Sequence, residues 1–285
     1  MRHARKERQR MVTISVLNLK GGVGKTLSSV NIAYELWRRG FKVLLLDNDK
    51  QGNLSKAYER YDTESVAPIT RLLNAEWKKA KDIIQPTDYE GIDIISANMS
   101  LFGASWHLFK DETANQTDRY RHFLKDAPLD VPGKATGNTY HLTPDTNYDY
   151  CIIDNPPDIG LNVINALAAS DRVIIPVKID EWALEGLDIL TEQIKDAKSL
   201  NKDLDIQGSV IVTEYRNTDA EAAGVEWIQK SAYNLLGIIR YSKKVAESTF
   251  CFKPIYEYSP CSAAAQDYKR LATQITGKDR KGGRK

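Results

Sequence analysis

A glycine-rich turn between a strand pattern and a helix pattern constrains this sequence more than any other feature. Residues 12–17, VTISVL, alternate apolar and polar side chains in a way that is typical of a strand. Residues 20–26, KGGVGKT, form the turn, and apolar residues then recur at helical spacing, which predicts a helix over residues 26–39. Residues 42–47, KVLLLD, read as a strand buried on both faces. Together they have the order and length of a strand-helix-strand crossover, the unit of a parallel sheet.

The alternation of strands and helices continues along the chain. The further predicted strands are residues 92–95, 150–154, 172–177 and 208–212. The further predicted helices are residues 101–124, 160–169, 183–199, 221–235 and 262–275. Because strands that alternate with helices are typical of α/β domains, we expect one doubly wound, mainly parallel sheet flanked by helices, over residues 11–277.

The composition of the chain excludes several classes of protein. Of its 285 residues 42% are apolar and 27% are charged, so the chain can bury a core and does not resemble a disordered protein. It has no run of 18 apolar residues that could span a membrane, and its start does not resemble a secretory signal. The three cysteines and four histidines lack the spacing of a disulfide framework or a zinc site. We therefore expect a cytoplasmic protein.

Both ends of the chain are basic. Residues 1–10 contain five Arg or Lys and one Glu, and residues 278–285 contain five Arg or Lys and one Asp. Without these two segments the chain has 30 basic and 36 acidic residues. Such segments are usually solvated tails, and the alternative is an attraction to nucleic-acid phosphates. Residues 128–147, which are rich in Pro, Gly, Thr and Asn, predict an extended surface loop.

The turn over residues 20–26 has the chemistry of a phosphate-binding loop. Its glycines let successive backbone N–H groups point at phosphate oxygens, and the helix that follows offers its positive N-terminus to the same anion. Lys25 would reach the β- and γ-phosphates, and the Thr26 hydroxyl would ligate Mg²⁺. A tight turn without a ligand is the alternative, but such a turn does not need Gly-Lys-Thr after two glycines. The expected ATP-binding residues are Lys20, Gly21, Gly22, Val23, Gly24, Lys25, Thr26 and Leu27.

Two features of this loop depart from the ordinary phosphate-binding loop. Leu19 stands where the first glycine is usual, and a second lysine, Lys20, lies within the loop. In this respect KGGVGKT resembles the deviant Walker A box of the ParA/MinD family of dimerising ATPases. The resemblance implies that Lys20 reaches across a dimer to the partner's nucleotide, so that two subunits enclose two ATP molecules.

Two acidic segments match the same family in order and spacing. Residues 44–55, LLLDNDKQGNLS, are similar to its second acidic motif, which implies that Asp49 activates the attacking water and that Asp47 supports the magnesium shell. Residues 148–160, YDYCIIDNPPDIG, resemble its Walker B and switch II stretch, which implies that Asp154 binds Mg²⁺ through water. Aspartates at such places also occur as helix caps or turn formers. The implied catalytic residues are Lys20, Lys25 and Asp49, and the implied metal ligands are Thr26, Asp47 and Asp154.

The resemblance covers the chain from about Val12 to Ile275, with some departures. Leu27 replaces a second hydroxyl residue that would contact the α-phosphate. Lys50 stands where a proline commonly follows the catalytic aspartate, and Asn155 separates the Walker B aspartate from the proline pair. These differences bear on the adenine and α-phosphate contacts more than on the phosphate-binding loop itself.

The C-terminal end distinguishes the branches of this family. Members similar to MinD end in an amphipathic membrane helix, whereas the residues after Ile275, TGKDRKGGRK, contain no bulky apolar side chain. We therefore expect no membrane partner and a resemblance to the ParA branch, whose ATP dimers bind double-stranded DNA without sequence preference. The implied DNA-binding residues are Arg216, Arg240, Lys243, Lys244, Lys269 and Arg270, which as isolated side chains would be ordinary surface.

The resemblance implies a ParA-type DNA-partition ATPase with ATP and Mg²⁺ as cofactors. ATP would close a homodimer that holds nucleoid DNA, and a ParB-like centromere-binding partner would stimulate hydrolysis and release. Two alternatives remain open at this point. One is a positioning ATPase with the same mechanism and a protein cargo, and the other is a nucleotide-gated adaptor with little turnover.

Overall fold

The computed structural model describes residues 10–110, 116–125, 148–180, 183–205 and 210–279. Residues 1–9 and 280–285, which make up most of the two basic end segments, lie outside the described residues. The predicted surface loop over residues 128–147 lies outside them as well, so its conformation stays a prediction.

Within the described ranges, eight strands form one sheet in the order β3-β4-β2-β5-β1-β6-β7-β8. Every neighbouring pair is parallel except β3 and β4, so the expected mainly parallel sheet is confirmed. The strands are β1 (Val12–Val16), β2 (Val43–Asp47), β3 (Gln85–Pro86), β4 (Ile92–Ile95), β5 (Tyr150–Asp154), β6 (Arg172–Val177), β7 (Val210–Tyr215) and β8 (Leu235–Arg240).

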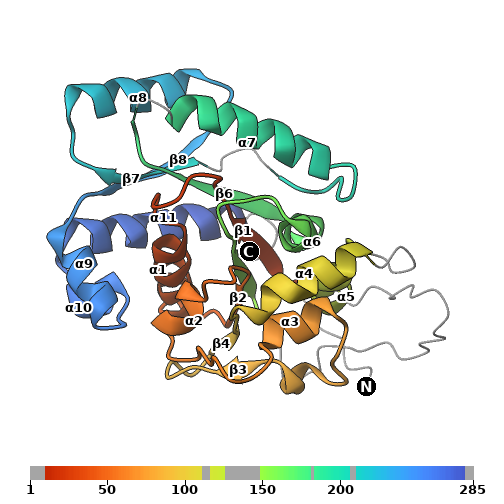
Figure 1. Ribbon diagram of the computed structural model, residues 1–285. Coiled ribbons are helices and arrows are strands. Elements are labelled where there is room, and N and C mark those ends of the chain that lie inside the picture. Colours follow the sequence, from red (N-terminus) through yellow and green to blue (C-terminus); the bar gives the residue numbers. More distant parts are fainter. Residues whose placement is uncertain (1–9, 111–115, 126–147, 181–182, 206–209, 280–285) are drawn as a thin grey trace, which may run out of the picture.

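Helices cover both faces of this sheet (Figure 1). In the first half of the chain they are α1 (Lys25–Trp37), α2 (Asn53–Ala57), α3 (Pro68–Leu73), the 3₁₀ turn η1 (Ala80–Asp82), α4 (Ser100–Lys110) and α5 (Arg119–Lys125). In the second half they are α6 (Leu161–Ala169), α7 (Ala183–Ala197), α8 (Asp219–Lys230), α9 (Lys243–Phe250), α10 (Ile255–Tyr258) and α11 (Ala263–Asp279).

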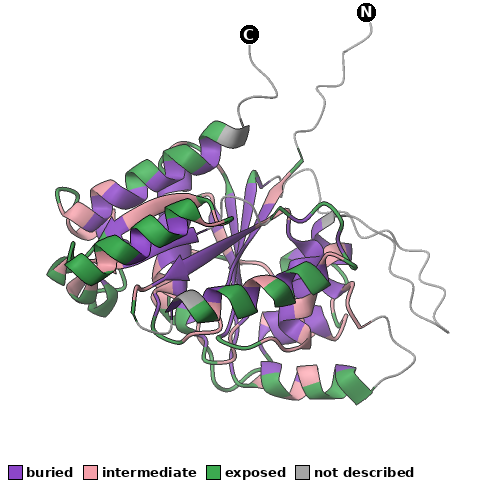
Figure 2. Ribbon diagram, turned by 90° about the horizontal axis from the view of Figure 1, so that it is seen from above, coloured by how far each residue is buried: buried purple, intermediate pink, exposed green. Residues whose placement is uncertain are grey.

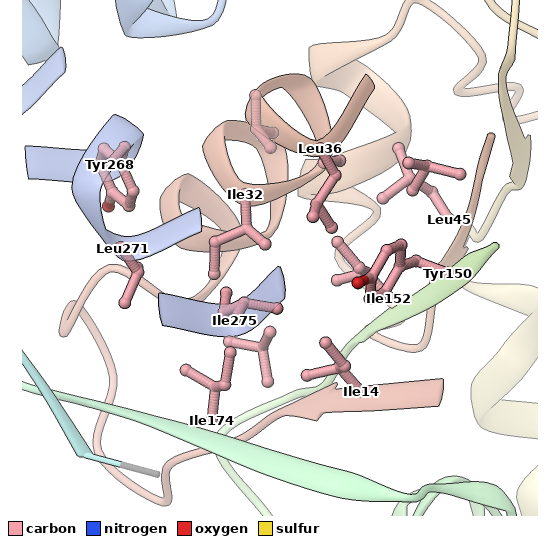
Figure 3. Packing of buried hydrophobic residues seen from close by; sticks show 14 of the residues in the cluster. Ile14, Ile32, Leu36, Leu45, Tyr150, Ile152, Ile174, Tyr268, Leu271 and Ile275 are labelled. Atoms are coloured by element: carbon pink, nitrogen blue, oxygen red, sulfur yellow. The ribbon is translucent and has the colours of Figure 1, made fainter. Parts of the chain in front are cut away.

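One face of the sheet is covered by α1 and α11. Figure 3 shows apolar side chains of these two helices packed on strands β1, β2, β5 and β6. The side chains are Ile32 and Leu36 from α1, Tyr268, Leu271 and Ile275 from α11, and Ile14, Leu45, Tyr150, Ile152 and Ile174 from the strands.

The opposite face packs against α3 to α8. Because successive side chains of a strand point to opposite faces, Val43 and Leu45 of β2 join the α1 core whereas Leu44 and Leu46 join the core under α3 to α6. Helices α7 and α8 cover β6 and β7 in a third apolar cluster. Figure 2 shows the buried strands between these two layers, with the exposed residues on the outer helices. The strand predicted over residues 42–47 is β2, which is buried on both faces from Val43 to Asp47, whereas Lys42 precedes it and is exposed.

The position of β1 fixes where a ligand can bind. β1 pairs with β5 on one side and with β6 on the other. After β1 the chain forms β2, β3, β4 and β5 on the first side, and then β6, β7 and β8 on the second side. In open parallel sheets, ligands bind beyond the carboxyl ends of the strands at the point where the strand order reverses. The glycine-rich turn that follows β1 lies at that point.

Two of the predicted helices differ from the structure in more than the position of their ends. In place of the helix predicted over residues 101–124 the structure has α4 and α5, and residues 111–115 between them lie outside the described residues, as do residues 208 and 209 of the predicted strand 208–212. The helix predicted over residues 221–235 ends at Lys230, and the residues from Leu235 onward form strand β8. Gly237 lies where β8 packs closely against α11. A Cβ at this position would lie 3.2 Å from Cδ1 of Leu271 on that helix.

Candidate functional site

The turn after β1 has a backbone that only glycine adopts easily. Gly22 has φ 72° and Gly24, which caps the start of α1, has φ 86°, and both values lie in the left-handed region. A Cβ at Gly21 would meet no atom within 4 Å. The turn therefore exposes its backbone on the open side, as an anion-binding loop requires.

The turn is anchored from beneath by strands β6 and β7. The hydroxyl of Thr213, within β7, donates a 2.8 Å hydrogen bond to the carbonyl of Val23, which is buried. The Asn18 side-chain amide donates to the Pro176 carbonyl at 2.7 Å, and its oxygen accepts from the Lys20 N–H at 2.9 Å. These bonds fix the loop before any ligand is present.

Lys25 lies folded onto the loop that it follows. Its Nζ donates a 2.8 Å hydrogen bond to the Lys20 carbonyl, and the residue is only 8% exposed. Burial lowers the pKa of Lys25, while the carboxylates of Asp154, Asp49 and Asp158 act in the opposite direction. The Lys25 ammonium group is therefore buried near these carboxylates, at the point where the loop joins α1.

Thr26 and Asp154 lie in direct contact across the site. The Thr26 hydroxyl in the first turn of α1 donates to one Asp154 oxygen at 2.7 Å, and the Ser29 hydroxyl donates to the other at 2.9 Å. Asp154 ends β5 and is 1% exposed. Burial, with the nearby charge of Asp47, raises the pKa of Asp154 to about 7 despite these two bonds.

Asp47 faces Asp154 from the neighbouring strand, since the two are register partners in β2 and β5. One of its oxygens accepts hydrogen bonds from the Ser55 N–H and hydroxyl, both at 2.7 Å, and the other accepts from the Asp49 N–H at 3.2 Å. Burial raises the pKa of Asp47 to about 6. The Asp47 carboxylate is therefore hydrogen-bonded to α2 and to the loop before it. Its expected role in the magnesium shell stays a prediction.

Asp49 lies on the loop between β2 and α2 and is partly exposed. Its carboxylate accepts the Gln51 N–H at 2.9 Å and lies close enough to Lys25 to affect the pKa of that ammonium group. The next residue, Lys50, forms an ion pair of 3.6 Å with Asp158, on the loop after β5. The loops after β2 and β5 are therefore joined above the site.

Lys20 is held by a residue that was not among the predicted site residues. The Lys20 ammonium forms an ion pair with Asp180, which follows β6. Both side chains are partly exposed, so the pair lies at the surface of the site. The segment that contains Asp180 matched the ParA branch as a whole, but nothing in its spacing indicated this contact.

A buried amide network beneath the site was also missed. The Asn48 amide donates to Asn155 at 2.8 Å, its oxygen accepts from the Tyr120 hydroxyl at 2.8 Å, and its carbonyl accepts from Asn162 at 2.9 Å. Asn155 also donates to the Val16 carbonyl at 3.2 Å. Asn155, which stood out as a departure from the family, thus ties the ends of β1, β2 and β5 together. The sequence signal that could have indicated this network is an asparagine directly after each of two strands, Asn48 after β2 and Asn155 after β5.

The residues present fit a magnesium ion held largely by oxygen atoms of a nucleotide and water. Among the described residues, no group of three or more His, Cys, Asp or Glu side chains could hold a metal ion alone. The Thr26 hydroxyl and the Asp154 carboxylate lie 2.7 Å apart at the loop, and both are oxygen ligands of the kind that Mg²⁺ prefers.

Two of the six predicted DNA-binding residues share one buried carboxylate. The Arg240 Nε and N–H each donate to one Asp267 oxygen at 2.9 Å, and its Nη2 donates to the other at 3.0 Å. Arg270 pairs with the same carboxylate, which is 3% exposed. Arg240 and Arg270 therefore have a structural role, whether or not they also contact DNA.

The remaining four of these residues lie at the surface near the ends of β7 and β8 and on α11. The Arg216 guanidinium lies 4.1 Å from the centroid of the Tyr241 ring, and Lys244 forms a 2.7 Å ion pair with Glu247. Lys243 and Lys269 are exposed. The Tyr241 N–H donates to the Tyr215 carbonyl at 2.9 Å, which holds the loops after β7 and β8 side by side.

No helix in the described part of the chain is long and apolar enough to cross a membrane. A protein family described as an AAA domain matches residues 11–206. Over 267 residues the chain is 34% identical to the sporulation initiation inhibitor protein Soj of Bacillus subtilis, and the match covers 92% of this chain and 97% of that protein. It is 31% identical over 274 residues to the chromosome partitioning protein ParA of Caulobacter vibrioides, and the match covers 94% of each.

Solved structures share the fold. A plasmid partition protein of Borrelia burgdorferi bound to AMPPNP matches with a TM-score of 0.74 at 22% identity, over 94% of this chain and 100% of that one. At this identity the likeness establishes the fold alone, a doubly wound and mainly parallel sheet flanked by helices.

Proposed function

This chain belongs to the ParA/MinD family of AAA-domain ATPases, in its Soj-like branch, and we propose that it is a ParA-type DNA-partition ATPase. In this proposal ATP closes a homodimer that holds DNA without sequence preference, and a ParB-like centromere-binding partner stimulates the hydrolysis that releases it. The observation that carries the proposal is one loop with two lysines, Lys20 and Lys25, next to the contact between Thr26 and Asp154.

The first step is the binding of ATP with Mg²⁺. The backbone N–H groups of residues 21–26 and the Lys25 ammonium would bind the β- and γ-phosphates. Thr26 and Asp154 would hold Mg²⁺, which supplies neutralisation of the charge on the phosphate oxygens. Asp154 already lies at the Thr26 hydroxyl with a pKa raised to about 7, so a cation at this place would relieve a buried carboxylate.

The hydrolytic step needs a carboxylate near the γ-phosphate. Asp49 fits this role because it is partly exposed, follows the strand next to β5 and lies within electrostatic reach of Lys25. Its carboxylate would orient and deprotonate the attacking water, while lysines carry the negative charge that develops on the phosphate oxygens.

The dimer would use Lys20. In the monomer Lys20 is paired with Asp180 of its own chain, and both side chains are partly exposed. An exposed ion pair contributes at most about 1 kcal/mol, so a phosphate of the partner's nucleotide can replace Asp180 at small cost. Dimerisation would then depend on ATP if Lys20 contacts the γ-phosphate, because ADP and the nucleotide-free protein both lack this group.

The dimer would bind DNA through the surface at the ends of β7 and β8 and the middle of α11. This surface carries Arg216, Lys243, Lys244 and Lys269, together with the paired Arg240 and Arg270. Contacts of lysine and arginine with phosphates carry no base information, so this binding would be indifferent to sequence and would weaken with salt. The protein would act in the cytoplasm, on nucleoid DNA.

Two substitutions test the ATPase switch. Light scattering in ATP and Mg²⁺ should detect a dimer of the wild type and of Asp49→Ala, and no dimer of Lys20→Ala. Phosphate release should be lost in both variants, and Asp49→Ala should stay on DNA. Lys42→Ala is the matched control, because Lys42 is exposed and precedes β2, at the opposite end of the sheet from the site. Unchanged ATP-dependent dimerisation of Lys20→Ala would refute the role of Lys20 across the dimer.

A further inference from the structure

Asp49 lies between two residues that both contact the loop after β5. On one side, the buried Asn48 side chain donates a 2.8 Å hydrogen bond to the side-chain oxygen of Asn155. On the other side, the Lys50 ammonium group forms its 3.6 Å ion pair with Asp158. Asp49 is therefore placed between two contacts with the same neighbouring loop.

The loop after β5 is a firm support for these contacts. Pro156 and Pro157 fix two of its backbone φ angles, and Pro156 is buried. The Asn155 N–H donates a 3.1 Å hydrogen bond to the Val16 carbonyl at the end of β1. Asp158 follows directly after these residues. A side chain that pairs with Asp158 is thus attached to a part of the chain with little conformational freedom.

The other contacts of Asp49 and its neighbours join them to their own side of the site. The Asp49 N–H donates to the Asp47 carboxylate at 3.2 Å, and the Asp49 carboxylate accepts the Gln51 N–H at 2.9 Å. Gly52 packs tightly, since a Cβ there would lie 2.9 Å from the Ala97 carbonyl oxygen. None of these contacts joins Asp49 to β5, so its placement relative to that strand depends on the residues on either side of it.

The two contacts with the loop after β5 differ in strength. The Asn48 side chain is fully buried and belongs to the amide network that also includes Tyr120, so its place is fixed. The side chains of Lys50 and Asp158 are 35% and 50% exposed, and an exposed ion pair is weak. The ion pair between Lys50 and Asp158 is therefore the contact that can open and close.

This ion pair belongs to the surroundings of the phosphate site. The carboxylates of Asp49 and Asp158 both act to raise the pKa of the Lys25 ammonium group, against the effect of its burial. Because the interaction between charges falls with distance, both carboxylates lie near Lys25. Since Lys50 is the next residue after Asp49, a movement of Lys50 also displaces Asp49.

We propose that Lys50 and Asp158 are positioning residues, which hold the Asp49 carboxylate toward the γ-phosphate through the ion pair between them. This inference rests on the proposed function, since it takes Asp49 as the group that activates the attacking water. Such a group must lie within hydrogen-bond reach of the water, so a small displacement slows hydrolysis. Lys50 and Asp158 themselves take no part in the chemical step.

The first test measures the loop after β2 without nucleotide. The N–H groups of Asp49 and Gly52 are hydrogen-bonded within this part of the chain. Their hydrogen exchange should be up to about five-fold faster in Lys50→Met and in Asp158→Asn than in the wild type, because an exposed pair is weak. The double variant Lys50→Asp, Asp158→Lys restores an ion pair and should exchange more slowly than either of its single variants. The melting temperature should not distinguish the variants from the wild type.

The second test measures phosphate release in ATP and Mg²⁺. Lys50→Met and Asp158→Asn should each lower kcat by up to about five-fold and leave the KM for ATP unchanged, because they displace Asp49 and leave the phosphate contacts intact. Lys50→Arg keeps the ion pair and should keep kcat. Lys230→Met is the matched control, because it breaks an exposed ion pair within α8 and should change neither constant.

The two variants remove opposite charges, which separates positioning from a direct effect of charge. Positioning predicts that Lys50→Met and Asp158→Asn lower kcat alike, whereas an effect of charge on the γ-phosphate predicts changes in opposite directions. Opposite or absent changes in kcat would overturn this inference, as would exchange rates that both variants leave unchanged. A wild type that releases no phosphate would contradict the proposed function instead, and the exchange rates would still show whether the ion pair holds the loop.

Discussion

The Lys20 ammonium forms an ion pair with the Asp180 carboxylate of the same chain, on the loop that follows β6. The resemblance to dimerising ATPases implies that this ammonium group contacts a phosphate bound to another subunit. Lys20, which is expected to act across a dimer, is therefore paired within its own chain.

Removal of this carboxylate should favour the dimer. Asp180→Asn leaves Lys20 without its partner in each of the two subunits. Because an exposed pair contributes at most about 1 kcal/mol, the dimer gains at most about 2 kcal/mol, and its apparent dissociation constant in ATP should fall by up to about 30-fold. Light scattering at a series of protein concentrations in ATP and Mg²⁺ measures this. Glu226→Gln, which breaks an exposed pair on α8, should leave the constant unchanged. Weaker dimerisation of Asp180→Asn would mean that Asp180 supports the dimer.

Ionisation of Asp154 should lower the stability of the unliganded protein. The pKa of Asp154 is raised from 3.8 to about 7, so between about pH 4 and 7 the folded state binds more protons than the unfolded state. Stability from this group therefore falls as pH rises through that range, by at most about 1.4 kcal/mol for each unit of the pKa difference.

Asp154→Asn removes this titration and resembles the protonated carboxyl in shape. Its melting temperature relative to the wild type should rise between about pH 5 and pH 7 and change little above that range. A difference between the two proteins that is independent of pH would mean that Asp154 is ionised throughout the range.

The buried amides beneath the site should contribute to stability. Asn48→Ala removes a partner from the Tyr120 hydroxyl and from Asn155, which are both buried, and should cost about 1–3 kcal/mol in the free energy of unfolding. Urea denaturation without nucleotide measures it. Asn234→Ala, at an exposed asparagine, should change stability by less than about 0.5 kcal/mol. Equal stability of the two variants would contradict the importance of the network.

The central strands and the backbone of the glycine-rich turn were predictable because local patterns determine them. β4, β5 and β6 have the predicted bounds, and Gly22 and Gly24 have the left-handed backbone that a phosphate-binding turn needs. β3 was missed because it has two residues, one of them a proline, and gains its conformation only by pairing with β4.

The contacts around the loop were less predictable because they join distant parts of the chain. Asp180 is 160 residues from Lys20, and Tyr120 is 72 residues from Asn48. No periodic pattern in the sequence predicts contacts between residues so far apart in the chain. Ser29 is the exception, because its position three residues after Thr26 on α1 places both hydroxyls on the side of the helix that faces Asp154.

DNA binding should depend on the exposed lysines in a measurable way. In ATP and Mg²⁺, Lys243→Ala and Lys269→Ala should each weaken binding to every duplex alike and reduce the slope of log K against log salt by about 0.9. Lys230→Ala on α8 is the control and should leave the slope unchanged. Arg240 is a poor choice, because its removal would leave Asp267 buried with one partner fewer and destabilise the fold.

The most direct test of the account is the binding of purified protein to an arbitrary DNA duplex without nucleotide, with ADP and with ATP and Mg²⁺, at low and high salt. The account predicts tight binding only with ATP and Mg²⁺, with a strong dependence on salt and none on sequence. Binding that is absent with ATP, or that is the same in all three nucleotide states, would contradict it and would indicate a switch that acts on a protein cargo.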